Sequence, residues 1–486
     1  MWKPKNPITY QTNPGRIPTR EEAARSRLFS PVSIGASTTM EQRTWIPAMV
    51  PWRATEDGLV SDDVLDWYRR FAQGRPGAIV IEATGIRDVP SGPLLRIGDD
   101  RFIPGLRKLV DTIHEASDGH TRALIQIIDF LNIRRRPEPE KFFLRFLAIT
   151  DGHRQAIDAI GWPEDKVRDH LATLSAEELK KALSEREWQD YQYGARERVT
   201  DLDLPHIREL PQRLPALFAA AGRRARMAGF DGIELHYAHA YTMASFLSAT
   251  NDRRDGYGGT RENRIRLPLE VYRAVREAVG NDYTLGCRFL TEECIPGGTE
   301  LDDATYFGVE FARAGMDFLS TSRGGKFDDA QQPDVGASVY PYTGYSGFEC
   351  MPPIQSDGVG PFGRNAAATA SVRGAIRAAG LATPVVCSGG VHNFEMAERM
   401  LSDGVCDIVG SARQSLADPD WFRKIQLGLG ETVRLCAFTN YCEGLDQKHK
   451  EVTCRLWDKL QVKEAGVKLD KKGKRRLIAP GWTEPA

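Results

Sequence analysis

The chain has 486 residues and a mass of 54.2 kDa. Because an ordinary domain has roughly 100 to 200 residues, we expect several small domains or one large barrel with additions. A content of 41% hydrophobic and 27% charged residues is typical of a globular protein, and no apolar run approaches the roughly 18 residues of a membrane helix. Lys and Arg total 65 and Asp and Glu total 66, so no global field favours nucleic acid or an anionic membrane. We therefore expect a small-molecule partner, with no nucleic acid and no membrane.

The first 27 residues are polar, charged and rich in Pro, and they lack the apolar core of a secretory signal. We interpret them as an N-terminal extension of a cytoplasmic protein. In that reducing compartment the eight cysteines are expected to be free thiols.

Short β-rich runs alternate with amphipathic stretches over most of the chain. The β-rich runs are Thr44–Val50, Ala78–Thr84, Arg122–Ile128, Gly232–Tyr237, Thr284–Leu290, Asp317–Ser322, Pro384–Gly390 and Asp407–Arg413. The amphipathic stretches include Phe102–Glu115, Leu214–Met227, Arg264–Val279, Asp302–Ala314 and Phe394–Ser402. Eight such units predict an α/β fold, a parallel (β/α)8 TIM barrel with its active site at the carboxyl ends of the strands. A doubly wound open sheet is the alternative.

Two segments exceed a minimal barrel. Residues 132–210 are polar and partly helical (Ala176–Tyr193), with a basic and aromatic patch at Arg134–Arg145, and we expect an excursion over the barrel mouth. The segment Lys459–Arg476 has eight basic and two acidic residues and is expected to be a solvated, partly ordered arm. The predicted organisation is an extension at 1–27, a barrel at 28–455 and a basic tail at 456–486.

A cluster of His236, His239 and Tyr241 follows the fourth predicted strand. At the catalytic rim of a barrel, two imidazoles could bind a carbonyl oxygen while the phenol supplies a proton. The histidine spacing of three lacks the i, i+4 pair of a helical zinc site, so no metal is predicted. A purely structural histidine pair remains an alternative interpretation.

Ser388-Gly389-Gly390 ends the seventh predicted strand, and Arg413 ends the eighth. Barrels commonly bind a phosphate group at these two places, through backbone N–H groups and one cation. A plain Gly-Gly turn and a surface arginine are the alternative interpretations.

The stretches from Gly229 to His236 and from Asn251 to Arg264 closely resemble the signature of the Old Yellow Enzyme family of FMN-dependent oxidoreductases. Shorter similarities extend the resemblance from about Leu28 to Cys454, except in the excursion. The resemblance implies a TIM barrel that binds FMN, with the flavin phosphate near strands seven and eight.

The resemblance also implies roles for individual residues. Gln126 would bind the pyrimidine edge of the flavin, and Arg288 would face its N1/O2 side. The remaining contacts implied for FMN are Ala48, Met49, Ala83, His236, Gly389, Gly390, Ala412 and Arg413. NADH or NADPH would reduce FMN, His236 and His239 would hold the carbonyl oxygen of an electron-poor alkene, and Tyr241 would protonate its α-carbon.

Several positions depart from the family pattern. Tyr237 and Ala240 replace two glycines around the second histidine, and Val50 stands where many members have Thr or Cys. Asp129 takes the place of a frequent His, and Ala412 that of a Gly. The larger residues reduce the space at the rim, and a side-chain bond that adjusts the flavin potential is absent at Val50.

A branch of the family similar to dienoyl-CoA reductases carries four cysteines for a [4Fe–4S] cluster. This chain has Cys436, Cys442 and Cys454, with Thr439 between the first two, so we do not expect the cluster. The 32 residues after Cys454 are too few for a Rossmann domain, and electrons are expected to reach FMN directly at the barrel mouth.

The leading hypothesis is an FMN-dependent NAD(P)H oxidoreductase of the ene-reductase type. Alternatives are an enoyl- or aryl-CoA thioester reductase, suggested by Arg134-Arg135-Arg136 and Lys141-Phe142-Phe143, and a flavin-dependent dehydrogenase acting in the reverse direction. A barrel that binds a phosphorylated ligand without catalysis is the non-enzyme alternative. The sequence leaves open the substrate, the preferred nicotinamide and a homo-oligomeric state.

Overall fold

The computed structural model describes residues 10–89, 92–239, 241–293, 295, 297–324, 335–336, 360–446 and 448–485. Eight parallel strands close into a barrel in the order β3-β4-β5-β6-β7-β8-β9-β10, with β10 beside β3. This confirms the predicted (β/α)8 barrel. The strands are β3 (Thr44–Ile46), β4 (Ala78–Gly85), β5 (Arg122–Ile128), β6 (Gly232–Tyr237), β7 (Thr284–Leu290), β8 (Leu319–Ser322), β9 (Val385–Ser388) and β10 (Ile408–Gly410).

Three of the eight strands have the predicted bounds, and the others differ mainly at their ends. The first strand ends at Ile46 rather than Val50, since Pro47 has no N–H to donate to a neighbouring strand. The last strand ends at Gly410, so Arg413 does not end a strand but opens a short helix.

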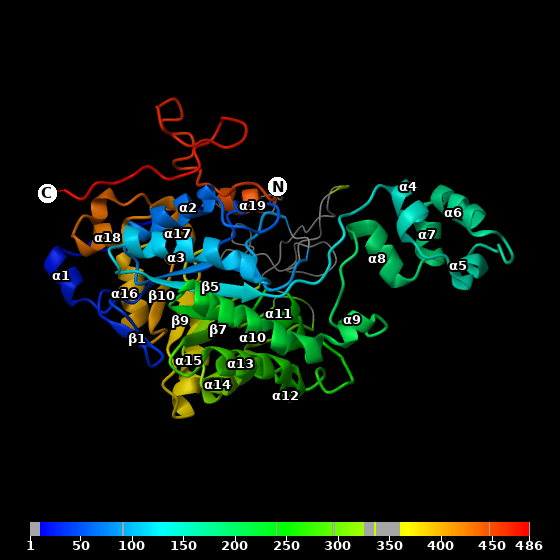
Figure 1. Ribbon diagram of the computed structural model, residues 1–486, viewed down its shortest axis with the longest axis horizontal. Coiled ribbons are helices and arrows are strands. Elements are labelled where there is room, and N and C mark those ends of the chain that lie inside the picture. Colours follow the sequence, from blue (N-terminus) through cyan, green and yellow to red (C-terminus); the bar gives the residue numbers. More distant parts are fainter. Residues whose placement is uncertain are drawn as a thin grey trace.

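Helices cover the outside of the barrel (Figure 1). The α-helices are α1 (Arg20–Arg25), α2 (Asp62–Ala72), α3 (Ile103–Ala116), α4 (Pro139–Lys141), α5 (Asp151–Ala156), α6 (Glu164–Thr173), α7 (Ala176–Ala182), α8 (Glu185–Tyr193), α9 (Pro205–Arg208), α10 (Leu210–Ala228), α11 (Thr242–Leu247), α12 (Arg261–Arg264), α13 (Arg266–Val279), α14 (Leu301–Arg313), α15 (Ala366–Ala378), α16 (Phe394–Ser402), α17 (Arg413–Ala417), α18 (Trp421–Gln426) and α19 (Tyr441–Asp446). Shorter helical turns are η1 (Asp100–Phe102), η2 (Phe142–Phe146) and η3 (Gly430–Thr432). Local signals set several ends: Asn393 caps α16 by accepting from the N–H of Met396, and Gly229 ends α10 with a φ of 92°.

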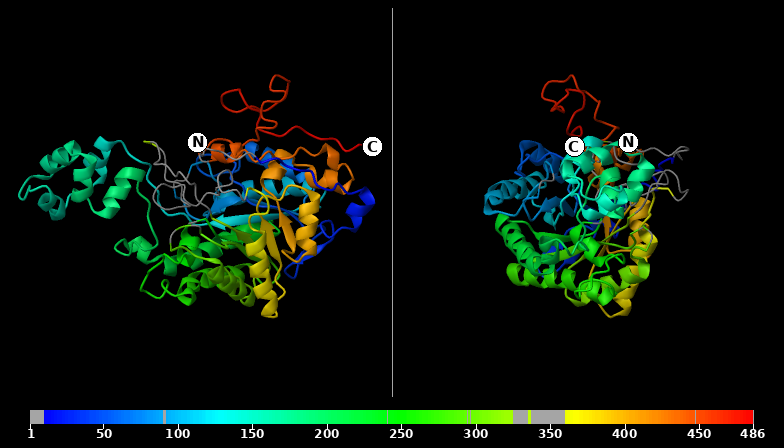
Figure 2. Two further views of the ribbon diagram at one scale, coloured as in Figure 1. Left: turned by 180° about the vertical axis from the view of Figure 1, so that it is seen from behind. Right: turned by 90° about the vertical axis from the view of Figure 1, so that its right-hand side faces the viewer.

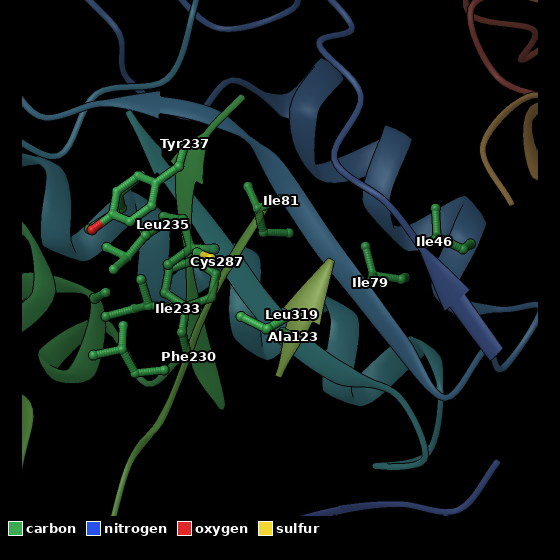
Figure 3. Close-up of a cluster of buried hydrophobic side chains, with 14 of the residues drawn as sticks. Ile46, Ile79, Ile81, Ala123, Phe230, Ile233, Leu235, Tyr237, Cys287 and Leu319 are labelled. Atoms are coloured by element: carbon green, nitrogen blue, oxygen red, sulfur yellow. The ribbon is translucent and has the colours of Figure 1, made fainter. Parts of the chain in front are cut away.

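The strand side chains separate into two buried groups, because successive residues of a strand point to opposite faces. Those that face the helices form the main core, and Figure 3 shows members of it such as Ile79, Ile233 and Leu235. Those that face the barrel axis form a second, smaller cluster that includes Trp45 and Phe318, whose rings lie 5.2 Å apart. The second cluster fills the amino-terminal part of the barrel interior.

A hairpin closes the amino-terminal end of the barrel. It consists of β1 (Val32–Ile34) and β2 (Thr38–Met40), which pair antiparallel. Ile34 and Met40 are fully buried in the inner cluster, and Thr284 at the start of β7 donates a hydrogen bond to the Ile34 carbonyl at 2.9 Å. The hairpin therefore covers the inner cluster at this end of the barrel.

One irregularity in β4 redirects two side chains. The register with β5 shifts between Ile81 and Thr84, which breaks the strict alternation. Glu82 consequently meets Tyr68 of α2, whose hydroxyl donates to the Glu82 carboxylate at 3.2 Å, while Ala83 lines the cavity described below.

Residues 132–210 form a helical lobe beyond the end of the barrel at which β5 finishes (Figures 1 and 2). An antiparallel bridge between Ile133 and Arg196 joins the outgoing and returning chains. The lobe has its own small core, which includes Phe142, Phe143 and Leu171. The helix predicted at Ala176–Tyr193 is broken into α7 and α8, because Ser184 caps α8 in a capping box with Glu187. That the lobe shapes the substrate entrance stays a prediction.

The basic tail is held to the barrel at several points rather than being fully solvated. Lys468 pairs with Asp63 at 2.5 Å and with Asp66 at 3.0 Å, both on α2. Arg53 and Arg70, which are buried, donate to main-chain carbonyls of the tail. Among the described residues six cysteines are free thiols, and within the same part of the chain no helix has the length and hydropathy to cross a membrane.

Candidate functional site

A cavity of about 360 Å³ opens at the carboxyl ends of the strands. All twelve residues predicted from the sequence to act in catalysis or cofactor binding line it. They are Ala48, Met49, Ala83, Gln126, His236, His239, Tyr241, Arg288, Gly389, Gly390, Ala412 and Arg413. The structure thus brings together residues from seven strands and the loops after them, while their individual roles remain predictions.

Three neighbouring strands supply the polar floor of the cavity. The register places Gln126 of β5 beside Glu234 of β6, and His236 of β6 beside Arg288 of β7. All four side chains occupy positions that face the barrel axis, on the carboxyl side of the apolar inner cluster. The floor therefore combines an amide, an imidazole and a guanidinium, and the buried Glu234 carboxylate lies beneath them.

His236 is held as a neutral hydrogen-bond donor. Burial, and then the nearby charge of Arg288, lowers the pKa of His236 to about 3. The N–H of Ala238 donates to Nδ1 of His236 at 3.3 Å, so the proton of the neutral ring lies on Nε2. His236 can donate from Nε2 throughout the physiological pH range.

His239 has a left-handed backbone, with a φ of 59°. Its ring lies 5.3 Å from that of His236, and its Nε2 lies 2.7 Å from the hydroxyl oxygen of Ser322 at the end of β8. Nη2 of Arg288 donates to the same hydroxyl at 3.1 Å. Burial also lowers the pKa of His239 well below its usual value, so both histidines of the cluster are neutral.

Tyr241 stands between two rings at the start of α11. Its ring centroid lies 5.3 Å from that of His236 and 5.2 Å from that of Phe130, both in edge-to-face arrangements. The next residue, Thr242, donates to the Asp129 carboxylate at 2.6 Å, and Arg87 pairs with the same carboxylate at 2.5 Å. Asp129 therefore holds the start of α11 in place, which accounts for an acidic residue at this position.

At the opposite end of the cavity, two segments of the main chain lie close together. Gly390 has a φ of 75°, and a Cβ there would lie 1.6 Å from the Pro361 carbonyl oxygen, so no larger residue fits without a change of structure. Arg413 donates to the Asn440 side chain at 2.9 Å and lies over the Phe438 ring, 4.7 Å from its centroid. This end of the cavity therefore has a half-buried Gly-Gly turn and an oriented guanidinium.

The donor set fits FMN. A flavin ring needs an amide-like partner at its pyrimidine edge and a cation near N1, and its phosphate needs N–H groups and a cation. Gln126 and Arg288 provide the first pair, whereas Gly389, Gly390 and Arg413 provide the second. Because the Pro361 main chain already explains the glycine at 390, a phosphate site at this turn stays a prediction, supported by the nearby Arg413.

Sequence reasoning missed several residues of the cavity wall. Ser322, Asn365, Phe438, Glu443 and Asp446 all line it. Burial raises the pKa of Glu443 to about 7, although the charge of Arg413 opposes this shift. No motif around these residues is distinctive, and only the closure of the barrel and the return of the chain after α18 place them beside the strands.

A second cavity, of about 400 Å³, adjoins the first and shares Arg413, Leu416, Phe438 and Cys442 with it. Its walls include Cys436, Cys442, Cys454 and Thr439. Burial raises the pKa of Cys442 and of Cys454 to about 12. Among the described residues no group of His, Cys, Asp or Glu side chains has the arrangement to hold a metal ion. Thr439 offers a hydroxyl where a four-thiolate cluster needs a fourth thiolate. That the chain holds no [4Fe–4S] cluster stays a prediction.

Residues 200–345 match the NADH:flavin oxidoreductase / NADH oxidase family. An NADH oxidase from Thermoanaerobacter brockii is 28% identical over 418 residues, which is 85% of this chain and 52% of that protein. The chain spans about half the length of the first curated relatives it matches.

Solved structures share the barrel. A 2-naphthoyl-CoA reductase complex matches with a TM-score of 0.62 and 18% identity, over 88% of this chain and 56% of the other. An Old Yellow Enzyme homologue from Zymomonas mobilis matches with a TM-score of 0.52 and 21% identity, over 82% of this chain and 91% of the other. The family match and the shared barrel confirm the resemblance of this chain to the Old Yellow Enzyme family of NADH:flavin oxidoreductases.

Proposed function

We propose that the protein is an FMN-dependent oxidoreductase that uses NADH or NADPH to reduce the C=C bond of an α,β-unsaturated carbonyl compound. The observation that carries this proposal is the single cavity in which a flavin-binding donor set and the cluster of His236, His239 and Tyr241 meet. When bound, FMN would supply a hydride from its N5 atom to the β-carbon of the substrate.

The histidine cluster would hold the carbonyl oxygen. His236 presents an N–H from Nε2 in its neutral form, as the hydrogen bond to Nδ1 requires. Negative charge grows on the carbonyl oxygen as hydride arrives at the β-carbon, and one preorganised donor can contribute about 3 kcal/mol to the stability of such a transition state. A neutral donor also avoids placing another full positive charge beside Arg288.

Tyr241 would deliver the proton to the α-carbon. It lines the cavity beside His236, and the Asp129–Thr242 contacts fix the start of its helix. The phenol would thus stand on the same rim as the carbonyl donors. Hydrogen-bond donors for the carbonyl oxygen and a proton donor on one rim suit net addition of hydrogen across a polarised double bond.

A CoA thioester substrate is the second candidate. The observation that favours it is the position of Arg134 at the root of the helical lobe, over the Phe146 ring at 4.3 Å and 3.9 Å from Asp190. A basic and aromatic surface beyond the strand ends suits the phosphates and the adenine of CoA. The 2-naphthoyl-CoA reductase among the structural neighbours acts on a ligand of this class.

The proposed function can be tested by reducing and reoxidising the protein under anaerobic conditions. The purified yellow protein would be reduced with NADH or NADPH and then reoxidised with a panel of simple enones and enoyl-CoA esters. Reoxidation by enones supports the proposed activity, and selective reoxidation by the CoA esters supports the second candidate. A colourless protein that does not take up FMN would overturn both and support a binding function.

A further inference from the structure

Glu234 lies directly beneath the flavin-binding part of the cavity. Its side chain is 0% exposed, and it is not among the residues that line the cavity. Its neighbours in the barrel, Gln126 and Arg288, both line it. Glu234 would therefore act on a bound group without touching it, through these two side chains.

The first link is a hydrogen bond to Gln126. Nε2 of Gln126 donates to Oε1 of Glu234 at 2.5 Å, across a pair of residues that are in register on β5 and β6. A carboxylate only accepts hydrogen bonds, so it selects the NH₂ group of the amide. This leaves the Gln126 carbonyl oxygen and its second N–H for the cavity, where the pyrimidine edge of a flavin offers both an N–H and carbonyl oxygens.

The second link is electrostatic. Burial raises the pKa of Glu234, whereas the positive charge of Arg288 and the hydrogen bond from Gln126 favour its ionised form. In its ionised form the Glu234 carboxylate would offset part of the Arg288 guanidinium charge in a buried region, where such interactions are strong. Arg288 then stabilises negative charge on reduced flavin less than an isolated guanidinium would.

We propose that Glu234 is a positioning residue that orients the Gln126 amide and offsets the charge of Arg288, and that it thereby sets the reduction potential of the flavin. This inference rests on the proposed function. It concerns the reduction potential of the flavin, which determines which substrates the reduced protein can reduce.

The test compares Glu234→Gln with the matched control Glu82→Gln. Glu82 is also fully buried on a barrel strand, but it bonds Tyr68 on the helix side, and its pKa of about 8 leaves it largely neutral at pH 7. The potential of bound FMN would be measured by anaerobic titration at pH 7. Loss of the Glu234 charge should favour reduced flavin at least tenfold, a positive shift of about 30 mV for a two-electron couple, and Glu82→Gln should leave the potential unchanged.

Two further results separate the possible failures. If the parent protein does not bind FMN, the proposed function fails and this inference falls with it. If the parent binds FMN but Glu234→Gln has the parental potential, the inference alone is overturned. Should Glu234→Gln not fold, Glu234→Asp keeps the charge but shortens the reach to Gln126. It should weaken FMN binding with a near-parental potential, and parental FMN binding would overturn the inference.

Discussion

His239 and Ser322 are 83 residues apart in the chain, yet Nε2 of His239 lies 2.7 Å from the hydroxyl oxygen of Ser322. Arg288 donates to the same hydroxyl. The serine therefore connects the imidazole proposed to bind the substrate with the guanidinium proposed to face the flavin. His239 has a left-handed backbone. The hydrogen bond between its ring and Ser322, on a different strand, helps to hold the ring in one orientation.

A first prediction concerns the carbonyl clamp. Replacing His236 or His239 by Ala should weaken binding of a phenol probe at least about tenfold, because a hydrogen bond to a charged acceptor is worth about 1.5–3 kcal/mol. Ser322→Ala should weaken phenol binding less, since the His239 ring remains but loses its hydrogen bond to Ser322. Titration of the flavin absorbance band measures the affinity.

The control for this set is His170→Ala, which lies in the helical lobe and should bind phenol like the parent. Parental phenol binding and enone turnover in both cavity variants would show that the histidine pair is structural. One equivalent of zinc in the parent, lost in both variants, would instead support a metal site.

A second prediction concerns Tyr241→Phe. Reduction of the flavin by NAD(P)H should remain near the parental rate, because that half-reaction needs no proton on carbon. Reoxidation by an enone should slow by about 10²- to 10⁴-fold, the usual contribution of a general acid. Stopped-flow measurement of both half-reactions checks this, with Tyr306→Phe on α14 as a control. An unchanged reoxidation rate would remove Tyr241 from the mechanism.

A third prediction concerns the retention of FMN. We expect FMN to be bound non-covalently, so acid precipitation should leave the yellow colour in the supernatant. Arg413→Ala should weaken FMN binding by about 1.5–3 kcal/mol, through loss of a charge-assisted bond to the phosphate. Arg399→Ala, which alters an exposed arginine on α16, should have no effect. Equal FMN affinity in the two variants contradicts the phosphate site.

A fourth prediction concerns pH. Burial raises the pKa of Glu443 to about 7, and this carboxyl group shares the cavity with Arg413. Below pH 7 the group is mainly neutral, and above pH 7 it becomes an anion that repels the FMN phosphate. FMN affinity should therefore fall as the pH rises from 6 to 8 in the parent, and it should fall less in Glu443→Gln. Fluorescence titration of FMN at both pH values measures this, and parallel pH profiles would contradict it.

Much of the barrel and of the candidate site could be predicted from the sequence, because the signals are local. Runs such as Arg122–Ile128 and Gly232–Tyr237 have the β-rich composition of buried parallel strands, and the structure has them with the same bounds. His236, His239 and Tyr241 are close in sequence, so locating one predicted strand located all three. Parallel strands bring their carboxyl ends to one edge, which is why residues from seven strands and their loops could be assigned to one cavity.

Tertiary structure decided what depends on distant contacts. The register shift in β4 turns Glu82 toward Tyr68 and Ala83 toward the cavity, although strict alternation would predict otherwise. Ser322 and Glu443 enter the site only because the barrel closes and the chain returns over its mouth. The sequence by itself determined the repeating strands and the histidine cluster, whose signals lie within a few residues. The register, the helical lobe and the partners of each buried charge required the fold, because they depend on which distant residues share a desolvated space.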